Sequence, residues 1–387
     1  MAANFFSKIT AHSGTTGSVG SADSGQHAGF PESLGFPELG FLDLREQDTK
    51  VLVISDLHMG SGKRDDLAPN GELLINLLEQ YYYPGGWYLA LNGDVEELYR
   101  YSLHAIQEQW SKLYSIFDLF AKENRLYKTL GNHDEDLVFE KNYPYPLYQA
   151  LRIESSELPI FVYHGHQSSS VYTNYNAVAR SLVRYILTPF GIKNISAARN
   201  PRRRFFVEKK AYAFSRENNC ISIIGHTHRA LFESLSRFDI VRFEIERLCR
   251  DYPASEGAKK KHIAEEVSAL RTELGKLRRS ERRDVLRQSL YGDELPVPCL
   301  FNSGSAINRR GISALELNDE TIALVYWFIE GREKKFVRRG NYRIEKIRGT
   351  PYGRAVLNQD RLDYIKARME LLGPATARGE PSPFGLG

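Results

Sequence analysis

The stretch Val51-Leu-Val-Ile-Ser-Asp-Leu-His58 decides the fold of this 387-residue chain. Its first four residues are apolar and mostly β-branched, and a Ser-Asp pair follows them, which is typical of a buried strand that ends in a polar turn. Asp56 and His58 therefore stand just beyond the carboxyl end of a strand. In open α/β sheets, ligands bind at this end of the strands.

Strands and helices alternate after this first strand. Short apolar runs predict the strands, and apolar residues three and four positions apart predict the helices. In chain order we expect a helix at Leu73–Leu78, a strand at Trp87–Leu91, a helix at Ser102–Ala121, strands at Arg125–Leu130, Pro159–Tyr163 and Ile221–Ile224, and a hairpin of Ile312–Leu317 with Thr321–Ile329. The alternation indicates βαβ units, and hence an α/β fold or a mixed α+β sandwich.

The composition is that of a globular protein. Hydrophobic residues make up 42% and charged residues 26%, and 52 basic side chains nearly balance 48 acidic ones, which excludes a wholly disordered or fibrous chain. No apolar run is long enough to span a membrane, so we expect neither a transmembrane segment nor a signal peptide. Three widely spaced cysteines provide no disulfide framework and no paired-cysteine metal site, and we expect a cytoplasmic protein.

The ends of the chain differ from its central part. Residues 1–48 are rich in Gly and Ser, and the stretch Ser13–Gly29 has no apolar periodicity, so we expect a disordered leader over residues 1–48. Residues 373–387 are mostly small and include prolines, and we expect a flexible tail. The domain that carries the strands is expected to span residues 49–372.

Two insertions are expected to interrupt this domain. Residues 168–218 predict a helical cap that contains the basic run Arg199-Asn-Pro-Arg-Arg-Arg204. Within that run, Arg202 and Arg203 are candidate contacts for an anionic substrate, and the run would also suit an acidic lipid headgroup or nucleic acid. Residues 243–292 include apolar residues that are alternately four and three positions apart, which predicts a basic helical hairpin. Its apolar stripe would form the seam of the hairpin itself or, as the second choice, contact a partner helix.

Metal-capable side chains follow five of the predicted strands. Besides Asp56-Leu-His58, the turns are Asn92-Gly-Asp94, Gly131-Asn-His-Asp-Glu135, His164-Gly-His166 and Gly225-His-Thr-His228. Six of the ten histidines of the chain lie in these turns. Carboxylates, an amide and imidazoles that converge on one edge of a sheet would be costly to desolvate without a cation. The sequence therefore predicts a metal cluster.

The spacing within the turns supports a metal site. Alternate side chains of an extended chain point the same way, so Asp56 and His58 can bind one ion from one side, and His226 and His228 can do likewise. Two ions held close together need a bridging carboxylate, for which Asp94 is the candidate. Asn132 would contribute a neutral oxygen.

Taken in order, the sequences D-x-H, G-D, G-N-H-D, H-G-H and G-H-T-H resemble the signature of the calcineurin-like metallophosphoesterase superfamily. The resemblance implies the four-layer αββα fold of that superfamily, here with a helical cap and a helical hairpin inserted. It also implies two divalent metal ions that share one carboxylate. One ion would be bound by Asp56, His58, Asp94 and His228, and the other by Asp94, Asn132, His164 and His226.

The resemblance also implies roles for the remaining turn residues. His133 would be the unliganded imidazole that donates a proton to the leaving oxygen or stabilises the transition state. Asp134 would orient His133, although a carboxylate at this position is equally suited to capping the following helix. His166 would contact the substrate or support a metal ligand.

The implied activity is hydrolysis of a phosphodiester, pyrophosphate or phosphomonoester bond by a hydroxide that the two metal ions activate. Mn²⁺ is the first choice of metal, and Fe, Zn, Co and Ni accept the same mixed ligand set. A cap inserted after the H-G-x turn is similar to the arrangement in the UDP-2,3-diacylglucosamine pyrophosphatases. Those enzymes usually carry an arginine in place of His133 and an aspartate in place of His166.

Two other functions are compatible with the sequence. A nuclease would explain the basic insertions, but the net charge of only +4 and the lack of a recognisable nucleic-acid motif argue against it. The same fold serves as an interaction scaffold in the retromer subunit that has lost metal ligands, whereas every expected ligand position is filled here. Peripheral contact of the basic cap with a membrane is a further expectation.

Overall fold

The computed structural model describes residues 39–62, 65–166, 201–235, 237–280, 296–308, 310–334, 337–338 and 342–373. Side chains are described throughout these ranges except at residues 201–203, 237–240 and 276–280. The statements that follow concern these parts of the chain.

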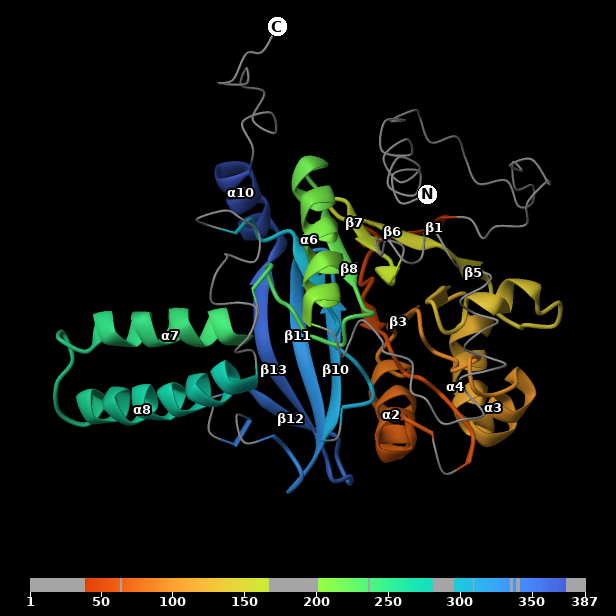
Figure 1. Ribbon diagram of the computed structural model, residues 1–387, viewed down its shortest axis with the longest axis horizontal. Helices are drawn as coiled ribbons and strands as arrows, with labels where there is room; N and C mark the ends of the chain where they lie inside the picture. Colours follow the sequence, from red (N-terminus) through yellow and green to blue (C-terminus); the bar gives the residue numbers. More distant parts are fainter. Residues whose placement is uncertain are drawn as a thin grey trace, which may run out of the picture.

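Two β-sheets form the centre of the molecule (Figure 1). In chain order the strands are β1 (Leu39–Asp43), β2 (Val51–Ile54), β3 (Tyr88–Asn92), β4 (Leu126–Thr129), β5 (Leu147–Tyr148), β6 (Ala150–Glu154), β7 (Ile160–Val162), β8 (Ile221–Ile224), β9 (Leu300–Asn302), β10 (Gly311–Leu317), β11 (Thr321–Ile329), β12 (Ile344–Lys346) and β13 (Tyr352–Arg361). The larger sheet has the order β12-β13-β11-β10-β2-β3-β4-β5, and the smaller sheet has the order β1-β6-β7-β8-β9.

Helices cover the outer faces of both sheets. The α-helices are α2 (Gly71–Leu77), α3 (Leu103–Gln109), α4 (Ser111–Lys122), α6 (Pro201–Glu217), α7 (Arg237–Asp251), α8 (Gly257–Ser280) and α10 (Leu362–Leu372). Three short helical turns are η2 (Ala68–Asn70), η3 (Leu78–Tyr82) and η4 (Glu135–Phe139). Side chains of α2 and α4 pack on the larger sheet, and side chains of α6 pack on the smaller sheet. None of the helices in the described ranges combines the length and the apolar composition that a membrane span requires.

The strand β2 lies between two hydrophobic cores. Val51 and Val53 belong to the core shared with the smaller sheet, whereas Leu52 and Ile54 belong to the core shared with α2 and α4. Because successive side chains of a strand point to opposite faces, a strand that is covered on both sides is apolar at every position. The result is a helix–sheet–sheet–helix arrangement, which confirms the predicted fold class.

The predicted strands correspond to β2, β3, β4, β7, β8, β10 and β11, and β10 pairs with β11 as an antiparallel hairpin as expected. The single helix predicted at Ser102–Ala121 is instead two helices that meet at Trp110. The indole Nε1 of Trp110 donates to the carbonyl oxygen of Gly60 at 3.1 Å and to Asp65 Oδ2 at 2.6 Å, and the ring is buried. These contacts hold Trp110 in a non-helical backbone conformation.

Both ends of the domain contain structure that the sequence did not predict. The disordered leader predicted for residues 1–48 is wrong for residues 39–48, because β1 pairs with β6 in parallel and buries Leu42 and Leu44. Residues 1–38 lie outside the described ranges. At the other end, β13 pairs with β11, and α10 packs against the core through Ile365. The predicted tail beyond residue 373 lies outside the described ranges.

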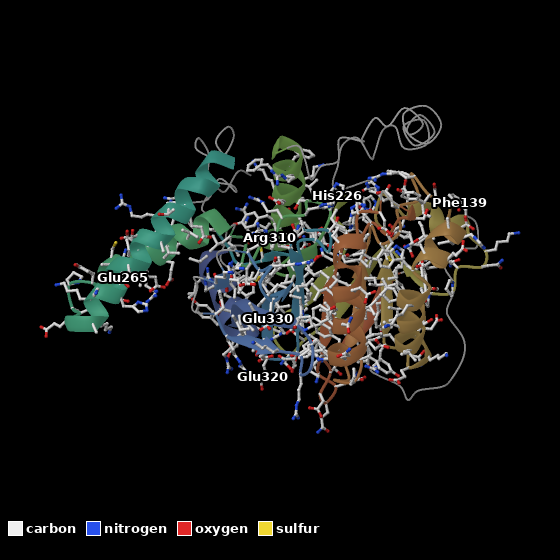
Figure 2. All side chains as sticks on the ribbon, turned by 90° about the horizontal axis from the view of Figure 1, so that it is seen from below. Phe139, His226, Glu265, Arg310, Glu320 and Glu330 are labelled. Carbon is white, nitrogen blue, oxygen red and sulfur yellow. The ribbon has the colours of Figure 1, made fainter. Side chains whose placement is uncertain are left out.

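The insertions are described only in part. Of the cap predicted for residues 168–218, the structure describes α6 and the residues after it; residues 167–200 lie outside the described ranges. The helices α7 and α8 lie side by side and project from the body (Figure 1), with Leu248 and Ile263 buried between them. Figure 2 shows Glu265 on this projection, far from His226. Residues 281–295 lie outside the described part of the chain.

Candidate metal centre

All five metal-capable turns lie at one edge of the two sheets. Three of them follow β2, β3 and β4, which are parallel neighbours in the larger sheet. The other two follow β7 and β8, which are parallel neighbours in the smaller sheet. Because parallel strands end at the same edge, their carboxyl-terminal turns converge there.

Left-handed backbone conformations turn the metal-capable residues toward one another. The φ angles are 55° at Asp56, 46° at His58, 51° at Asp94, 61° at His226 and 54° at His228. Such conformations cost a non-glycine residue about 1–3 kcal/mol each and cluster at functional sites. The extended geometry expected for Asp56 and His58 is therefore wrong. After β2 the chain continues alongside the segment that follows β3, and the amides of Asp56 and His58 donate to carbonyl oxygens of that turn at 3.1 and 2.9 Å.

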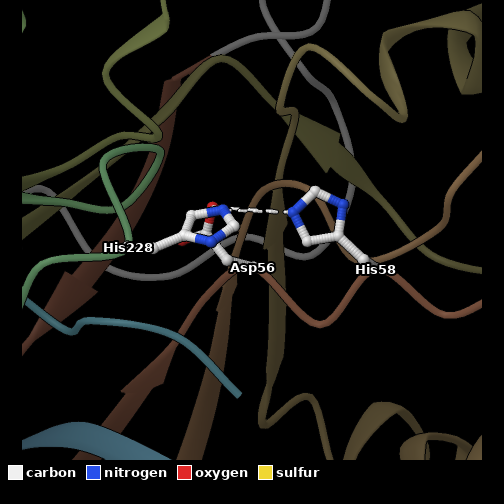
Figure 3. Close-up of side chains that lie close together, drawn as sticks. All are labelled: Asp56, His58 and His228. Atoms are coloured by element: carbon white, nitrogen blue, oxygen red, sulfur yellow. Dashed lines mark hydrogen bonds and ion pairs between the residues drawn. The ribbon is translucent and has the colours of Figure 1, made fainter. Parts of the chain in front are cut away.

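The first group of possible ligands consists of Asp56, His58 and His228 (Figure 3). Oδ1 of Asp56 lies 2.9 Å from Nε2 of His228, and the two Nε2 atoms of His58 and His228 lie 3.2 Å apart. Asp56 and His58 are buried. Two imidazole nitrogens and a carboxylate oxygen this close together form a set that a divalent cation can accept.

The second group consists of Asp94, His164 and His226, all of them buried. Nε2 of His164 lies 3.0 Å from Oδ2 of Asp94, and the same oxygen lies 3.8 Å from Nε2 of His58 in the first group. Asp94 therefore lies between the two groups. Burial lowers the pKa of His226 to about 3, which keeps its imidazole in the neutral form that binds metals.

Among the expected metal ligands, three atoms are buried without a hydrogen bond: Asp56 Oδ1, Asn132 Oδ1 and His164 Nε2. Buried polar atoms in proteins nearly always have a hydrogen-bond partner. Oδ1 of Asp56 lies 2.9 Å from Nε2 of His228, and Nε2 of His164 lies 3.0 Å from Oδ2 of Asp94, but neither contact forms a hydrogen bond. Buried ligand atoms that lie close together without hydrogen bonds fit a metal ion, and the mixed nitrogen and oxygen set suits a divalent ion.

Neighbouring groups hold these side chains in place. Nδ1 of His164 lies 2.8 Å from the carbonyl oxygen of Asn92, which directs Nε2 toward the centre. The hydroxyl of Ser55 donates to Oδ2 of Asp56 at 2.5 Å, and the amide of His226 donates to the same oxygen at 3.1 Å. Oδ1 of Asp56 is thereby left for a metal ion.

The imidazole of His133 pairs with a glutamate that the sequence analysis did not single out. Nδ1 of His133 lies 2.9 Å from Oε1 of Glu97, and Oε2 of Glu97 lies 3.1 Å from Nδ1 of His58. Burial opposes the charged form of His133, but the carboxylates of Glu97 and Asp94 outweigh burial and raise the pKa of His133 to about 9. Burial likewise opposes ionisation of Glu97, but the two imidazoles outweigh it and lower the pKa of Glu97.

Asp134 neither orients His133 nor caps a helix, which corrects both interpretations of this residue. Its carboxylate makes no capping hydrogen bond to η4. Oδ1 accepts from the amide of Gly131 at 2.7 Å, and Oδ2 accepts from the amide of Val95 at 2.8 Å and from Lys128 Nζ at 2.7 Å. Both oxygens of Asp134 are bound by the ammonium group and the two amides, and the imidazole of His133 pairs with Glu97 instead.

The expected substrate contacts are placed only in part. His166 is buried, and its ring centre lies 5.5 Å from that of His164 and 6.3 Å from that of His226, so it lies beside the second group of ligands. Arg202 and Arg203 belong to the first turn of α6, where the side chains lie outside the described part of the chain.

The sequence contained a signal for two residues that the sequence analysis missed. Glu97 comes three residues after Asp94, in the same turn that carries the expected bridging carboxylate. Lys128 stands in the middle of the buried strand β4, where a charged side chain needs a partner.

Comparison with known proteins gives one family match. The model of the calcineurin-like phosphoesterase family matches residues 49–252, which is more than half of the chain and includes all five turns. Among solved structures, YfcE, a phosphoesterase from E. coli, is 13% identical over 71% of this chain and 91% of its own, with a TM-score of 0.31. A single mutant of Vps29 from Entamoeba histolytica is 12% identical over 74% of this chain and 96% of its own, also with a TM-score of 0.31. No curated protein sequence matches the chain.

Proposed function

This chain belongs to the calcineurin-like phosphoesterase family, and from that premise we propose that it hydrolyses a phosphodiester, pyrophosphate or phosphomonoester bond with two divalent metal ions. One observation carries the proposal most directly. Two groups of possible ligands meet at Asp94, and the atoms that face the space between them, Asp56 Oδ1 and His164 Nε2, are buried without hydrogen bonds. Mn²⁺ is the metal we favour, and Fe, Zn, Co and Ni suit the same ligands.

We assign the ligands to two ions that share Asp94. One ion would be held by Asp56, His58, Asp94 and His228, and the other by Asp94, Asn132, His164 and His226. When bound, the ions would supply Lewis acidity that activates water and offsets the charge of the phosphoryl oxygens. The groups Asp56-His58-His228 and Asp94-His164-His226, together with the buried amide oxygen of Asn132, support this assignment.

The residues of the chain would then manage the proton of the leaving group. Glu97 faces Nδ1 of His133, so Nε2 of that imidazole is the atom that would deliver a proton to the leaving oxygen. The raised pKa of His133 keeps this proton in place at neutral pH. Glu97 is a positioning residue in this scheme, because it acts through His133.

The substrate side of the site is proposed from charge. The family acts on phosphoesters, so the substrate would be anionic, and His166, Arg202 and Arg203 are the contacts we propose for it. His166 lies beside the second group of ligands, which supports its part in this proposal.

Hydrolysis of chromogenic esters tests the function. The protein is stripped of metal and assayed with a monoester and a diester before and after Mn²⁺ is added back. We expect activity to return with metal in the unmutated protein, and in a control with the exposed carboxylate Asp363→Ala, but not in Asp94→Ala. Metal-dependent turnover by Asp94→Ala at the rate of the unmutated protein would overturn the proposal.

A further inference from the structure

A fully buried lysine lies behind the turn that carries Asn132 and His133. Lys128 belongs to β4, and its side chain has no exposed surface. An ammonium group is among the groups least often buried, because it loses its hydration. The proposed function gives this lysine no role, so its burial needs another explanation.

Lys128 is held between two carboxylates. Its Nζ lies 2.7 Å from Oδ2 of Asp134 and 3.0 Å from Oε2 of Glu96, and both acids are as fully buried as the lysine. Burial opposes the ammonium form, but the two carboxylates outweigh it and raise the pKa of Lys128. The other oxygen of Glu96 accepts from the hydroxyls of Tyr114 and Tyr143 at 2.9 and 2.8 Å, which ties the group to α4 and to the segment before β5.

Through Asp134 the lysine reaches the two turns at the centre of the proposed site. One oxygen of Asp134 accepts from the amide of Gly131, in the turn that carries Asn132 and His133. The other accepts from the amide of Val95, the residue after Asp94. A single carboxylate thus spans the turns after β3 and β4, and Lys128 is the cation that balances its charge.

We propose that Lys128 is a positioning residue for the metal centre. By holding Asp134, it fixes the separation between Asp94 on one turn and the Asn132-His133 pair on the other. The consequence for metal binding and turnover rests on the proposed function, whereas the effect on the two turns rests on the contacts alone. Without the ammonium group, Asp134 would lose the cation that lies 2.7 Å from its Oδ2, and two buried carboxylates would face each other without a counter-ion, so Asp134 would no longer be held in place between the two turns.

The variant Lys128→Met keeps most of the length of the side chain and removes its charge. In metal-free protein, hydrogen exchange followed by mass spectrometry should show amides of segments 93–97 and 130–134 exchanging about ten-fold faster than in the unmutated protein. Mn²⁺ affinity by calorimetry and kcat should each fall by about 10- to 100-fold, the range known when a group that supports the metal ligands from outside the ligand shell is lost. Unchanged exchange in both segments would overturn the proposal.

The matched control removes an equally buried cation elsewhere. Arg354 on β13 is 7% exposed and donates to Glu316 at 2.8 Å, and β11 and β10 separate its strand from β2. Arg354→Met should lower the melting temperature and leave exchange at segments 93–97 and 130–134, Mn²⁺ affinity and kcat unchanged. If Arg354→Met changes the exchange, the Mn²⁺ affinity and kcat as Lys128→Met does, a general loss of stability explains the effect, and the proposal fails.

A second variant distinguishes a role of Lys128 in positioning the two turns from a role in balancing the charge of the buried carboxylates. Lys128→Met combined with Glu96→Gln restores the net charge of the group, so its melting temperature should recover toward that of the unmutated protein. Exchange at the two turns should stay fast and Mn²⁺ affinity should stay low. If the melting temperature, the exchange at the two turns and the Mn²⁺ affinity all recovered, Lys128 would serve only to balance charge, which contradicts a positioning role. If the unmutated protein binds no divalent metal, the proposed function fails, whereas the exchange comparison still decides the position of the turns.

Discussion

Asp94 is the residue on which the account depends most. Its Oδ1 accepts from the amide of His133 at 2.8 Å, and its Oδ2 lies 3.0 Å from Nε2 of His164. The turn after β4 approaches it so closely that a Cβ atom at Gly131 would lie 2.2 Å from Oδ1 of Asp94. Glycine is required at position 131 because no side chain fits between the two turns.

The pairing of Glu97 with His133 can be tested by removing its charge. Glu97→Gln keeps the shape of the side chain but loses the carboxylate that holds the proton on His133. We expect kcat at saturating Mn²⁺ to fall by about 10- to 100-fold. The measurement is steady-state kinetics on a chromogenic ester.

The control for Glu97→Gln is a double-mutant cycle with His133→Ala. If Glu97 acts through His133, adding Glu97→Gln to His133→Ala should cost little further activity. Equal losses in the presence and absence of the imidazole would contradict the pairing.

At the scale of elements, the loop after β8 is tied to the last helix by a buried acid. The carboxylate of Glu233 pairs with Arg368 of α10, and Glu233 itself is 7% exposed. Burial raises the pKa of Glu233 to about 7, although Arg368 opposes this shift. The loop also carries His226 and His228 at its start, so the attachment joins the proposed metal centre to the end of the domain.

The raised pKa of Glu233 predicts a pH-dependent stability. Its pKa in the folded protein exceeds the ordinary value of 4.5, so the folded state binds more protons between about pH 4.5 and 7. The contribution of this residue to the free energy of unfolding is complete below that window and is lost as the pH rises through 7. Urea unfolding at several pH values should therefore show the difference between the unmutated protein and Glu233→Gln changing across the window.

The exposed Glu330 provides the comparison for this experiment. The difference between the unmutated protein and Glu330→Gln should change less with pH than the difference for Glu233→Gln, because an exposed carboxylate keeps its hydration on folding. A difference for Glu233→Gln that is constant with pH would contradict the account of its buried carboxyl.

At the scale of the whole molecule, the sequence analysis predicted those strands and helices that depend on apolar patterns within a short stretch of the chain. The strand Val51–Ile54 is covered on both faces, so its continuous apolar run was readable. The strand Leu39–Asp43 was not predicted, because the strand it pairs with, β6, lies more than a hundred residues away in the chain. The break at Trp110 was missed for the same reason, since Gly60 and Asp65, which hold the indole, are distant in sequence.

The same distinction applies to the site. The turns that carry Asp56, Asp94 and His228 were predicted because each follows a strand whose apolar run is visible in the sequence. The partner of His133 was not predicted correctly, because the choice between Asp134 and Glu97 depends on where Lys128 places its charge. That placement is a three-dimensional property of β4 and its neighbours.

The central claim, that one carboxylate serves two metal ions, is tested most directly by metal stoichiometry. Mn²⁺ bound per chain is measured by calorimetry and by elemental analysis for the unmutated protein, His228→Ala and Asp94→Ala. The account predicts two ions for the unmutated protein, one for His228→Ala and none at the same free Mn²⁺ concentration for Asp94→Ala. Two ions retained by a folded Asp94→Ala variant would contradict it.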